Sequence, residues 1–231
     1  MNDDNHALTN GQLNRLLLIT MAMVAVMFAA SAYAWFKLPA GVSIPVHWGI
    51  DGRPNRFAGK TQGLLIMPFV VLGMAMLFRI IPVIEPRQRN LLRSFVAYRA
   101  VVLSVSGFML VLHIAIIGNL LGIFSLDVAS IAGLSMSVLF MAMGNYLSKV
   151  RSNFMFGIRT PWTLSSNIAW ARTHRLGGRL IFAVGVVGLV LCPLLGPSGF
   201  RIFLSLGIAT ALFTVVYSWL VWRNAPDRQR N

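Results

Sequence analysis

Residues 151–179 read RSNFMFGIRTPWTLSSNIAWARTHRLGGR, a polar stretch with apolar runs on both sides. Together with Lys149 it carries six of the twenty Lys and Arg residues of the chain, and it contains no acid. The neighbouring runs reach about 20 residues, the length that an α-helix needs to cross the hydrocarbon core of a bilayer. The stretch itself is too polar to span, so it predicts a break between membrane-spanning helices.

The composition indicates the same fold class. Of 231 residues, 57% are apolar and 11% charged, and the mean hydropathy is +0.72, whereas a soluble domain has about 25% charged residues. So few charges could not solvate a globular surface. We therefore expect an all-α membrane protein with six transmembrane helices, at Leu16–Phe36, Leu64–Ile84, Ala100–Ile123, Val128–Leu147, Leu180–Leu195 and Ile202–Trp222.

The basic residues predict how these helices are oriented. Fourteen of them fall on the side that holds both termini and the 149–179 segment, and five fall on the other side. Because basic loops stay in the cytoplasm, both termini are expected inside, in a multi-pass protein of the bacterial cytoplasmic (inner) membrane. The predicted parts are a cytoplasmic N-terminus, two spans with an outer loop, four further spans and a cytoplasmic tail, at 1–15, 16–84, 85–222 and 223–231.

The end of the first span offers a cleavage alternative. Ala32 and Ala34 form a small-x-small pattern of the kind that signal peptidase cuts. The apolar run is longer than a usual signal-peptide core and more spans follow, so an uncut first span is expected.

The net charge of +14 raises the question of nucleic acid binding. The basic residues flank apolar segments, and no soluble domain is left to present a basic face. We therefore expect the anionic headgroups of the bilayer, not nucleic acid, as their partner. The single cysteine, Cys192, excludes an internal disulfide.

The loop between the first two spans is rich in Pro and Gly. Asp51-Gly52 predicts a tight turn, and His47-Trp48 suits a membrane interface. The spacing of His47 and Asp51 is compatible with a metal site, but the turn beside an interfacial His-Trp pair explains the same residues without one. No metal and no cofactor is expected.

Within the polar stretch, residues 165–176 predict an amphipathic helix at the headgroup level, with Thr163 or Ser165 as its cap and Gly177-Gly178 as its end. Trp170 and His174 are four residues apart and share one face. Two alternatives remain open: a basic interfacial connector, or a recognition site for a cytoplasmic partner.

This stretch also resembles the signature of the SdpI family of bacterial immunity proteins. That signature runs from an Asn through G-x-R-T-P-W-T-L to a Trp and a T-H-R with glycine after it. The matching residues here are Asn153, Gly157, Arg159, Thr160, Pro161, Trp162, Thr163, Leu164, Trp170, Thr173, His174, Arg175 and Gly177.

The outer loop resembles a short domain of unknown function that is commonly found ahead of the SdpI region and usually reads P-x-H-W-N-x-x-G-x-x-D. The matching residues here are Pro45, His47, Trp48 and Gly52. The chain departs from this pattern at two positions, with Gly49 in place of the usual Asn and Asn55 in place of the usual Asp.

The resemblance implies a six-span membrane protein that protects a producing cell from a secreted toxin peptide and sequesters a cognate transcriptional repressor. The outer loop would then face the toxin. The inner residues from Asn153 to Arg175 would hold the repressor or brace the helices from below.

Three polar residues fall in or near the spans: Arg79, His113 and Asn119. Polar groups at membrane depth are functional candidates, so a small-solute transporter or solute-sensing protein with His113 in its path is the alternative function. His113 and Asn119 serve equally well as hydrogen-bonding groups between helices, and Arg79 can reach the headgroups. With six acids, none in a span core, and four scattered histidines, no enzyme activity is expected.

Overall fold

The computed structural model describes residues 3–49, 51–123, 125 and 127–228, with side chains from residue 10 onward. Within these residues the chain forms eight α-helices and one antiparallel pair of strands. The elements in chain order are α1 (Asp3–Lys37), β1 (Ile44–Trp48), β2 (Pro54–Ala58), α2 (Lys60–Ile84), α3 (Gln88–Arg93), α4 (Phe95–Leu120), α5 (Val128–Leu147), α6 (Pro161–Leu164), α7 (Asn167–Leu195) and α8 (Pro197–Arg223).

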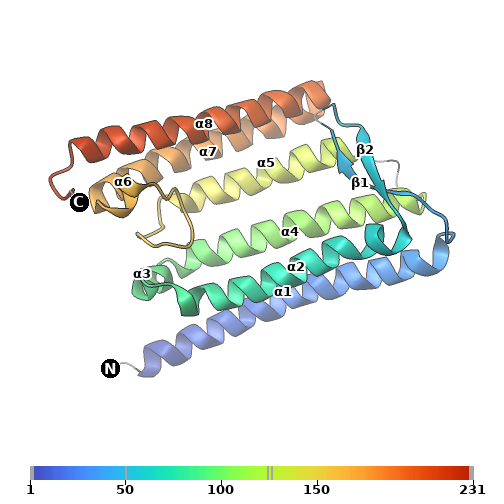
Figure 1. Ribbon diagram of the computed structural model, residues 1–231, viewed down its shortest axis with the longest axis horizontal. Helices are drawn as coiled ribbons and strands as arrows, with labels where there is room; N and C mark the ends of the chain where they lie inside the picture. The colour runs from blue at the N-terminus through green and yellow to red at the C-terminus, as the bar shows by residue number, and fades with distance from the viewer. Residues whose placement is uncertain (1–2, 50, 124, 126, 229–231) are drawn as a thin grey trace.

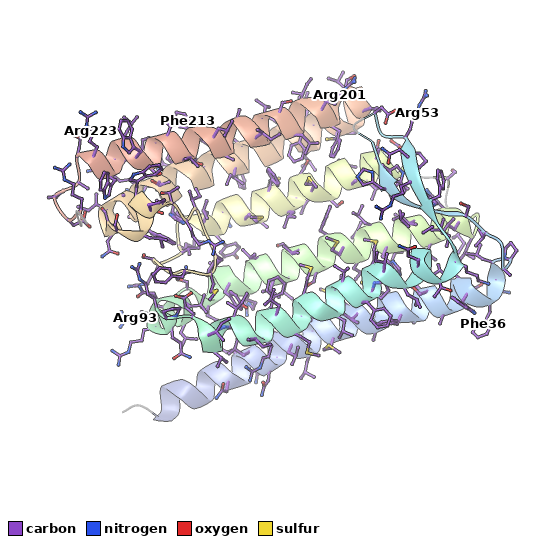
Figure 2. The ribbon with its side chains drawn as sticks, viewed as in Figure 1. Phe36, Arg53, Arg93, Arg201, Phe213 and Arg223 are labelled. Carbon is purple, nitrogen blue, oxygen red and sulfur yellow. The ribbon has the colours of Figure 1, made fainter. Side chains whose placement is uncertain are left out.

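Six of the described helices are long and apolar enough to cross a membrane, which confirms the predicted fold class. They are α1 from Asn10 onward, α2, α4, α5, α7 and α8. Large apolar side chains cover their outer faces: Leu18 is 68% exposed and Leu212 is 65% exposed. Figure 2 shows arginines at both ends of the helices and Phe213 on the surface between them. An apolar band of this extent indicates contact with lipid.

In the view of Figure 1 the long helices follow one another in the order α1, α2, α4, α5, α7 and α8, and α1 packs against both α2 and α4. The strands β1 and β2 lie at one end, which we call the hairpin end. Both termini, α3 and α6 lie at the other, which we call the signature end because residues 151–164 are there. The termini therefore share one side, as an even number of spans requires. That this side is cytoplasmic stays a prediction.

Glycines set the close contact between α5 and α7. A Cβ on Gly144 would lie 2.4 Å from the backbone nitrogen of Phe182 and 2.6 Å from the carbonyl oxygen of Gly178. A Cβ on Gly185 would lie 2.7 Å from the carbonyl oxygen of Ser137. Because lipid tails are as apolar as leucine, helices in a membrane associate through such close backbone contact. No other residue type fits at these crossings.

The structure differs from the prediction for residues 165–195. The expected interfacial helix and the fifth span are one uninterrupted helix, α7, which begins at Asn167. Gly177 and Gly178 do not end a helix but lie buried inside α7, where Gly178 meets α5. Close helix contact, not helix termination, therefore explains this pair.

The caps also fall elsewhere than predicted. Thr160 accepts a hydrogen bond from the N–H of Thr163 and begins α6, and Ser166 accepts one from the N–H of Ala169 and begins α7. Sequence patterns place such boundaries only to within a few residues.

Candidate functional site

The predicted turn at Asp51-Gly52 is present and joins two short strands. β1 and β2 are antiparallel, with Ile44 opposite Ala58 and Trp48 opposite Pro54. Gly52 has φ 77°, which favours glycine, and the Asp51 carboxylate accepts a hydrogen bond from the N–H of Arg53 at 3.1 Å. Asp51 and Gly52 therefore help to close the hairpin.

The side chain of His47 is held from the opposite strand. Its Nδ1 lies 2.6 Å from Oδ1 of Asn55, so Nδ1–H donates to this amide oxygen. Asn55 is the position at which the resemblance leads one to expect Asp, and an amide oxygen serves here in place of a carboxylate. His47 and Asp51 thus have separate partners, and the described residues contain no group of three or more His, Cys, Asp or Glu side chains able to hold a metal.

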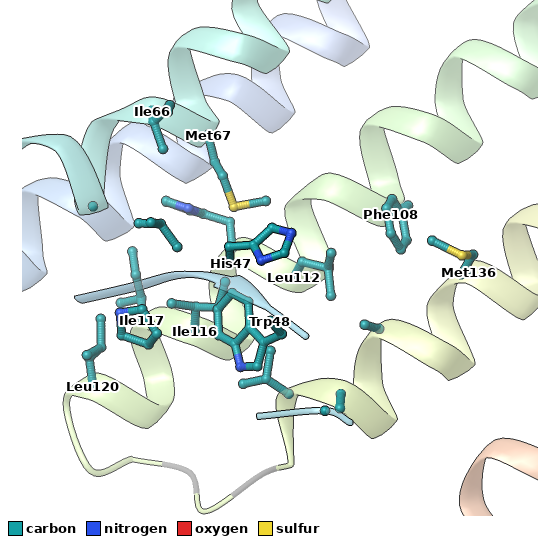
Figure 3. A pocket seen from close by; sticks show the side chains of 18 of the residues that line it. His47, Trp48, Ile66, Met67, Phe108, Leu112, Ile116, Ile117, Leu120 and Met136 are labelled. Atoms are coloured by element: carbon teal, nitrogen blue, oxygen red, sulfur yellow. The ribbon is translucent and has the colours of Figure 1, made fainter. Parts of the chain in front are cut away.

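Beneath the hairpin lies a cavity of about 430 Å³, which we call the hairpin cavity (Figure 3). Its roof is formed by residues 45–49 and Gly52 of the hairpin, and its walls are mostly apolar residues of four helices. Those walls include Met67 of α2, Phe108 and Leu112 of α4, Ala132 and Met136 of α5, and Phe200 of α8. The tip of the hairpin reaches across to α5 and α8, because a Cβ on Gly52 would lie 3.1 Å from Cβ of Ala129 and 3.4 Å from Pro197. The hairpin therefore extends from α2 to α5 and α8. It bridges the two halves of the helix row, by which we mean α1, α2 and α4 on one side and α5, α7 and α8 on the other.

His113 of α4 lies in the wall of this cavity and is 2% exposed. Its Nε2 is 3.0 Å from the hydroxyl of Ser31 and 3.2 Å from the carbonyl oxygen of Met27, both in α1. The Ser31 hydroxyl donates its own hydrogen to the carbonyl of Leu64 in α2 at 2.7 Å. Nε2 must therefore carry the proton, and Nδ1 is left as the acceptor of the ring. His113 ties α1, α2 and α4 together and adds one polar atom to an apolar space.

The structure thus brings together residues that the sequence singled out in two separate places. Four from the outer loop and one from the third span line the hairpin cavity: Pro45, His47, Trp48, Gly52 and His113. The other two polar candidates lie elsewhere. Arg79 is near the signature end of α2 beside a small cavity with Leu13 and Thr20, and Asn119 is half-buried in the last turn of α4.

At the signature end, the polar stretch is folded around Asn153. This side chain is fully buried. Its Oδ1 accepts hydrogen bonds from the N–H groups of Met155 and Phe156 at 2.9 and 2.8 Å, and its Nδ2 donates to the carbonyl of Arg151 at 2.9 Å. Asn153 therefore shapes the loop from within.

Trp170 and His174 fix the same loop to α7. Their rings stack at 4.0 Å between centroids, which confirms that they share one face. Trp170 Nε1 donates to the carbonyl of Val150 at 2.7 Å, and His174 Nε2 accepts from the N–H of Ile158 at 3.0 Å. Gly157 packs directly on the two rings, and its φ of 117° again requires glycine.

Residues 85–94 bind the loop from the other side. The buried carboxylate of Glu85 accepts from the N–H of Phe154 at 3.1 Å, and Asn90 Nδ2 donates to the carbonyl of Ser152 at 2.8 Å. Arg87 donates to the hydroxyl of Ser152 and to the carbonyl of Leu164. We call these contacts, together with those of Asn153, Trp170 and His174, the signature network.

The C-terminal tail closes the network. Asp227 accepts hydrogen bonds from the hydroxyl of Ser166 at 2.6 Å and from the N–H of Ile168 at 3.1 Å, at the start of α7. Burial by itself would raise the pKa of Asp227, but these hydrogen bonds, with one from the N–H of Asn167, outweigh it and lower the pKa from 3.8. The carboxylate is thus held in its charged form where the helix dipole favours it.

Most of the eleven residues predicted to bind an inner partner are therefore inside the protein. Six are buried: Asn153, Thr160, Thr163, Trp170, Thr173 and His174. Trp162 is half-buried, and four are exposed: Gly157, Arg159, Pro161 and Arg175. Arg159 also donates to the carbonyl of Phe154, which leaves only part of its guanidinium for other contacts.

Sequence reasoning missed several residues that build these two regions. Ser31, Glu85 and Arg87 hold them together, and the cavity walls come from four apolar spans. Two signals in the sequence could have indicated them: Ser31 is a polar residue in an apolar run, and Glu85 is an acid beside a basic loop. The cavity walls carried no signal, because lipid-facing and cavity-facing residues are equally apolar.

The six spans and the hairpin cavity define the class of this protein: a helical, multi-pass bacterial membrane protein. The model of the SdpI/YfhL protein family matches residues 149–218, and that of a domain of unknown function, DUF1648, matches residues 22–72. The comparisons confirm the predicted resemblance to the SdpI family, with DUF1648 ahead of the SdpI region. The match to DUF1648 covers the hairpin, and the match to SdpI covers most of the signature network.

Among curated proteins, the immunity protein SdpI of Bacillus subtilis (strain 168) is 24% identical over 174 residues. The aligned part is 75% of this chain and 80% of that protein. No solved structure matches the chain.

Proposed function

We propose that this SdpI-like protein gives its cell tolerance to a secreted, membrane-active peptide, and that apolar side chains of the peptide enter the hairpin cavity. The observation that carries the proposal is the position of this cavity, under the DUF1648 hairpin and between the two halves of the helix row. The name of the relative, an immunity protein, supports the same function.

The chemistry of the cavity favours such an occupant over a charged solute. Its size of about 430 Å³ is within the range of ligand sites, roughly 300–1,000 Å³. Its walls are apolar, and the Nδ1 atom of His113 is an isolated acceptor. An ion would lose its hydration there without a partner. Apolar side chains of a peptide already inserted in the bilayer would not.

The predicted orientation agrees with this function. The distribution of basic residues predicts that the hairpin end faces the outer side of the cytoplasmic membrane, where a secreted peptide arrives. The transport alternative rested on His113, and the hydrogen bonds of that ring to Ser31 and Met27 account for it as a contact between helices.

The test fills the cavity from one wall. Ala132→Phe adds a ring on α5 inside the cavity, and Val138→Phe adds the same ring on the same helix at a position that is 56% exposed on the outside. A peptide-sensitive bacterium expressing the native chain should survive a panel of membrane-active killing peptides better than one with an empty vector. The added ring takes up part of the space that the peptide side chains need, so Ala132→Phe should reduce protection about tenfold, which corresponds to about 1.4 kcal/mol of binding free energy. Val138→Phe should retain protection.

This experiment tests both parts of the proposal, the tolerance itself and the use of the hairpin cavity. If the native chain protects against no peptide of the panel, the tolerance function is wrong. If it protects and Ala132→Phe protects equally at the same membrane level, the peptide does not use the hairpin cavity.

Capture of a cytoplasmic repressor, the second activity implied by the family, is proposed only for the exposed part of the signature. Arg159 is exposed there and Trp162, three residues further on, is half-buried. Arg159→Ala and Trp162→Ala should release a repressor encoded beside this gene from the membrane fraction, with the protein still inserted. Normal capture by both variants would leave the stretch with its bracing role alone.

A further inference from the structure

A second cleft lies at the signature end, between the end of α5 and α7. It has a volume of about 650 Å³ and is lined by Asn145 and Ser148 of α5 and by Arg175, Arg179 and Phe182 of α7. Gly144 and Gly178, which bring the two helix backbones into contact, also line it. The long side chains on either side of this glycine contact enclose the cleft.

The polar groups of this cleft are donors without internal partners. Arg175 and Arg179 are four residues apart on one face of α7, so their like charges repel. In the part of the chain that the structure describes, neither guanidinium forms an ion pair or a hydrogen bond, and the side chains of Asn145 and Ser148 form none either. No acid lines the cleft. An anion with several acceptor oxygens, such as a phosphate, would satisfy all four groups.

The surface of α7 that continues from the cleft toward the hairpin end indicates which kind of molecule this phosphate belongs to. Phe182, Val186, Val190 and Leu194 continue the face of Arg175 and Arg179 along α7, and they are 39%, 40%, 50% and 72% exposed. From Arg179 to Val190 the helix rises about 16 Å, close to half of the roughly 30 Å hydrocarbon core. A basic head followed by an apolar stripe of this length matches one phospholipid of one leaflet.

We propose that the cleft of Asn145, Ser148, Arg175 and Arg179 is a binding site for the phosphate of an anionic phospholipid, whose acyl chain lies along the α7 stripe. The site lies at the opposite end of the helices from the hairpin cavity and is independent of peptide tolerance. It also gives Arg175, a residue of the family signature, a contact outside the protein. The lipid would hold α5 and α7 at their tightest crossing.

The test measures lipid binding by the full chain in a neutral detergent, with phosphatidylglycerol as the probe and native mass spectrometry as the readout. About 0.5 M salt removes the general attraction between a basic surface and anionic lipid. Arg179→Gln removes a charge-assisted hydrogen bond and should weaken binding about tenfold. Asn145→Ala, which leaves the charge intact, should weaken it about threefold.

The matched control is Arg172→Gln, which removes one charge from the same helix at an exposed position outside the cleft. It should change the affinity by less than about twofold. Equal losses for Arg172→Gln and Arg179→Gln would show a general charge effect and overturn the site. Displacement of phosphatidylglycerol by inorganic phosphate at millimolar concentration would show a site for a free anion and overturn the lipid as its ligand.

Discussion

The hairpin end and the signature end of the molecule use polar residues in opposite ways. At the hairpin end, β2 is exposed at Pro54, Asn55, Arg56 and Phe57. The side chains of His47 and Asn55, which bond across the two strands, are open to solvent. At the signature end, Asn153, Trp170 and His174 are buried and all three bond to the backbone of the same loop, residues 150–158. A cavity lies behind the first set of polar residues, and interior packing lies behind the second.

This difference teaches which end stabilises the fold and which end is free to accept a ligand. Buried hydrogen bonds are costly to break, because each orphaned group loses about 1–3 kcal/mol. A small exposed hairpin has few such contacts and opens locally at low cost. We therefore expect substitutions at the signature end to change stability and substitutions at the hairpin end to change binding.

The strongest test of this difference removes one asparagine side chain at each end. Asn153→Ala orphans two N–H groups and a carbonyl in a buried loop, and should lower the free energy of unfolding by about 2–4 kcal/mol. Asn55→Ala removes one exposed hydrogen bond and should lower it by less than about 1 kcal/mol. Denaturant unfolding of the purified protein in detergent measures both, and equal losses would contradict the comparison.

The contact of Asp227 with α7 makes a smaller, pH-dependent contribution at the signature end. Because the folded protein lowers the pKa of Asp227 below 3.8, its contribution is complete above pH 3.8 and is lost as pH falls through the folded value. Asp227→Asn should therefore destabilise the protein slightly at pH 7, and the difference from the native chain should vanish in strong acid. Thermal unfolding from pH 7 to pH 3 checks the sign, and a difference that grows with acidity would contradict it.

The smallest effect is expected from restoring the usual residue at the hairpin end. Asn55→Asp places a carboxylate where the amide oxygen now lies 2.6 Å from Nδ1 of His47, and a hydrogen bond to an ionised acceptor is stronger than one to an amide. In an exposed site this adds less than about 1 kcal/mol to the hairpin. Hydrogen exchange of residues 44–58 should slow slightly and stay unchanged at the signature end. Faster exchange would show that the amide is the better partner here.

The residues of the candidate sites could be predicted from the sequence to different degrees. His47, Trp48 and Gly52 stood out because a loop with His, Trp and a turn glycine between two spans is unusual, and the cavity roof could be named from them. His113 stood out as a polar group in a span, but nothing in the sequence related it to that roof. The contact depends on how α1, α2 and α4 meet through Ser31, which is a property of three distant segments.

The sequence by itself determined the six spans, since each needs about 20 consecutive apolar residues and the chain offers six such runs. It also determined the family resemblance, which local motifs carry. Only the tertiary structure decided that most of the polar signature is interior support and that the hairpin covers a cavity. Burial and cavities arise where distant helices meet, and apolar runs look alike whether they face lipid, a neighbouring helix or an empty space.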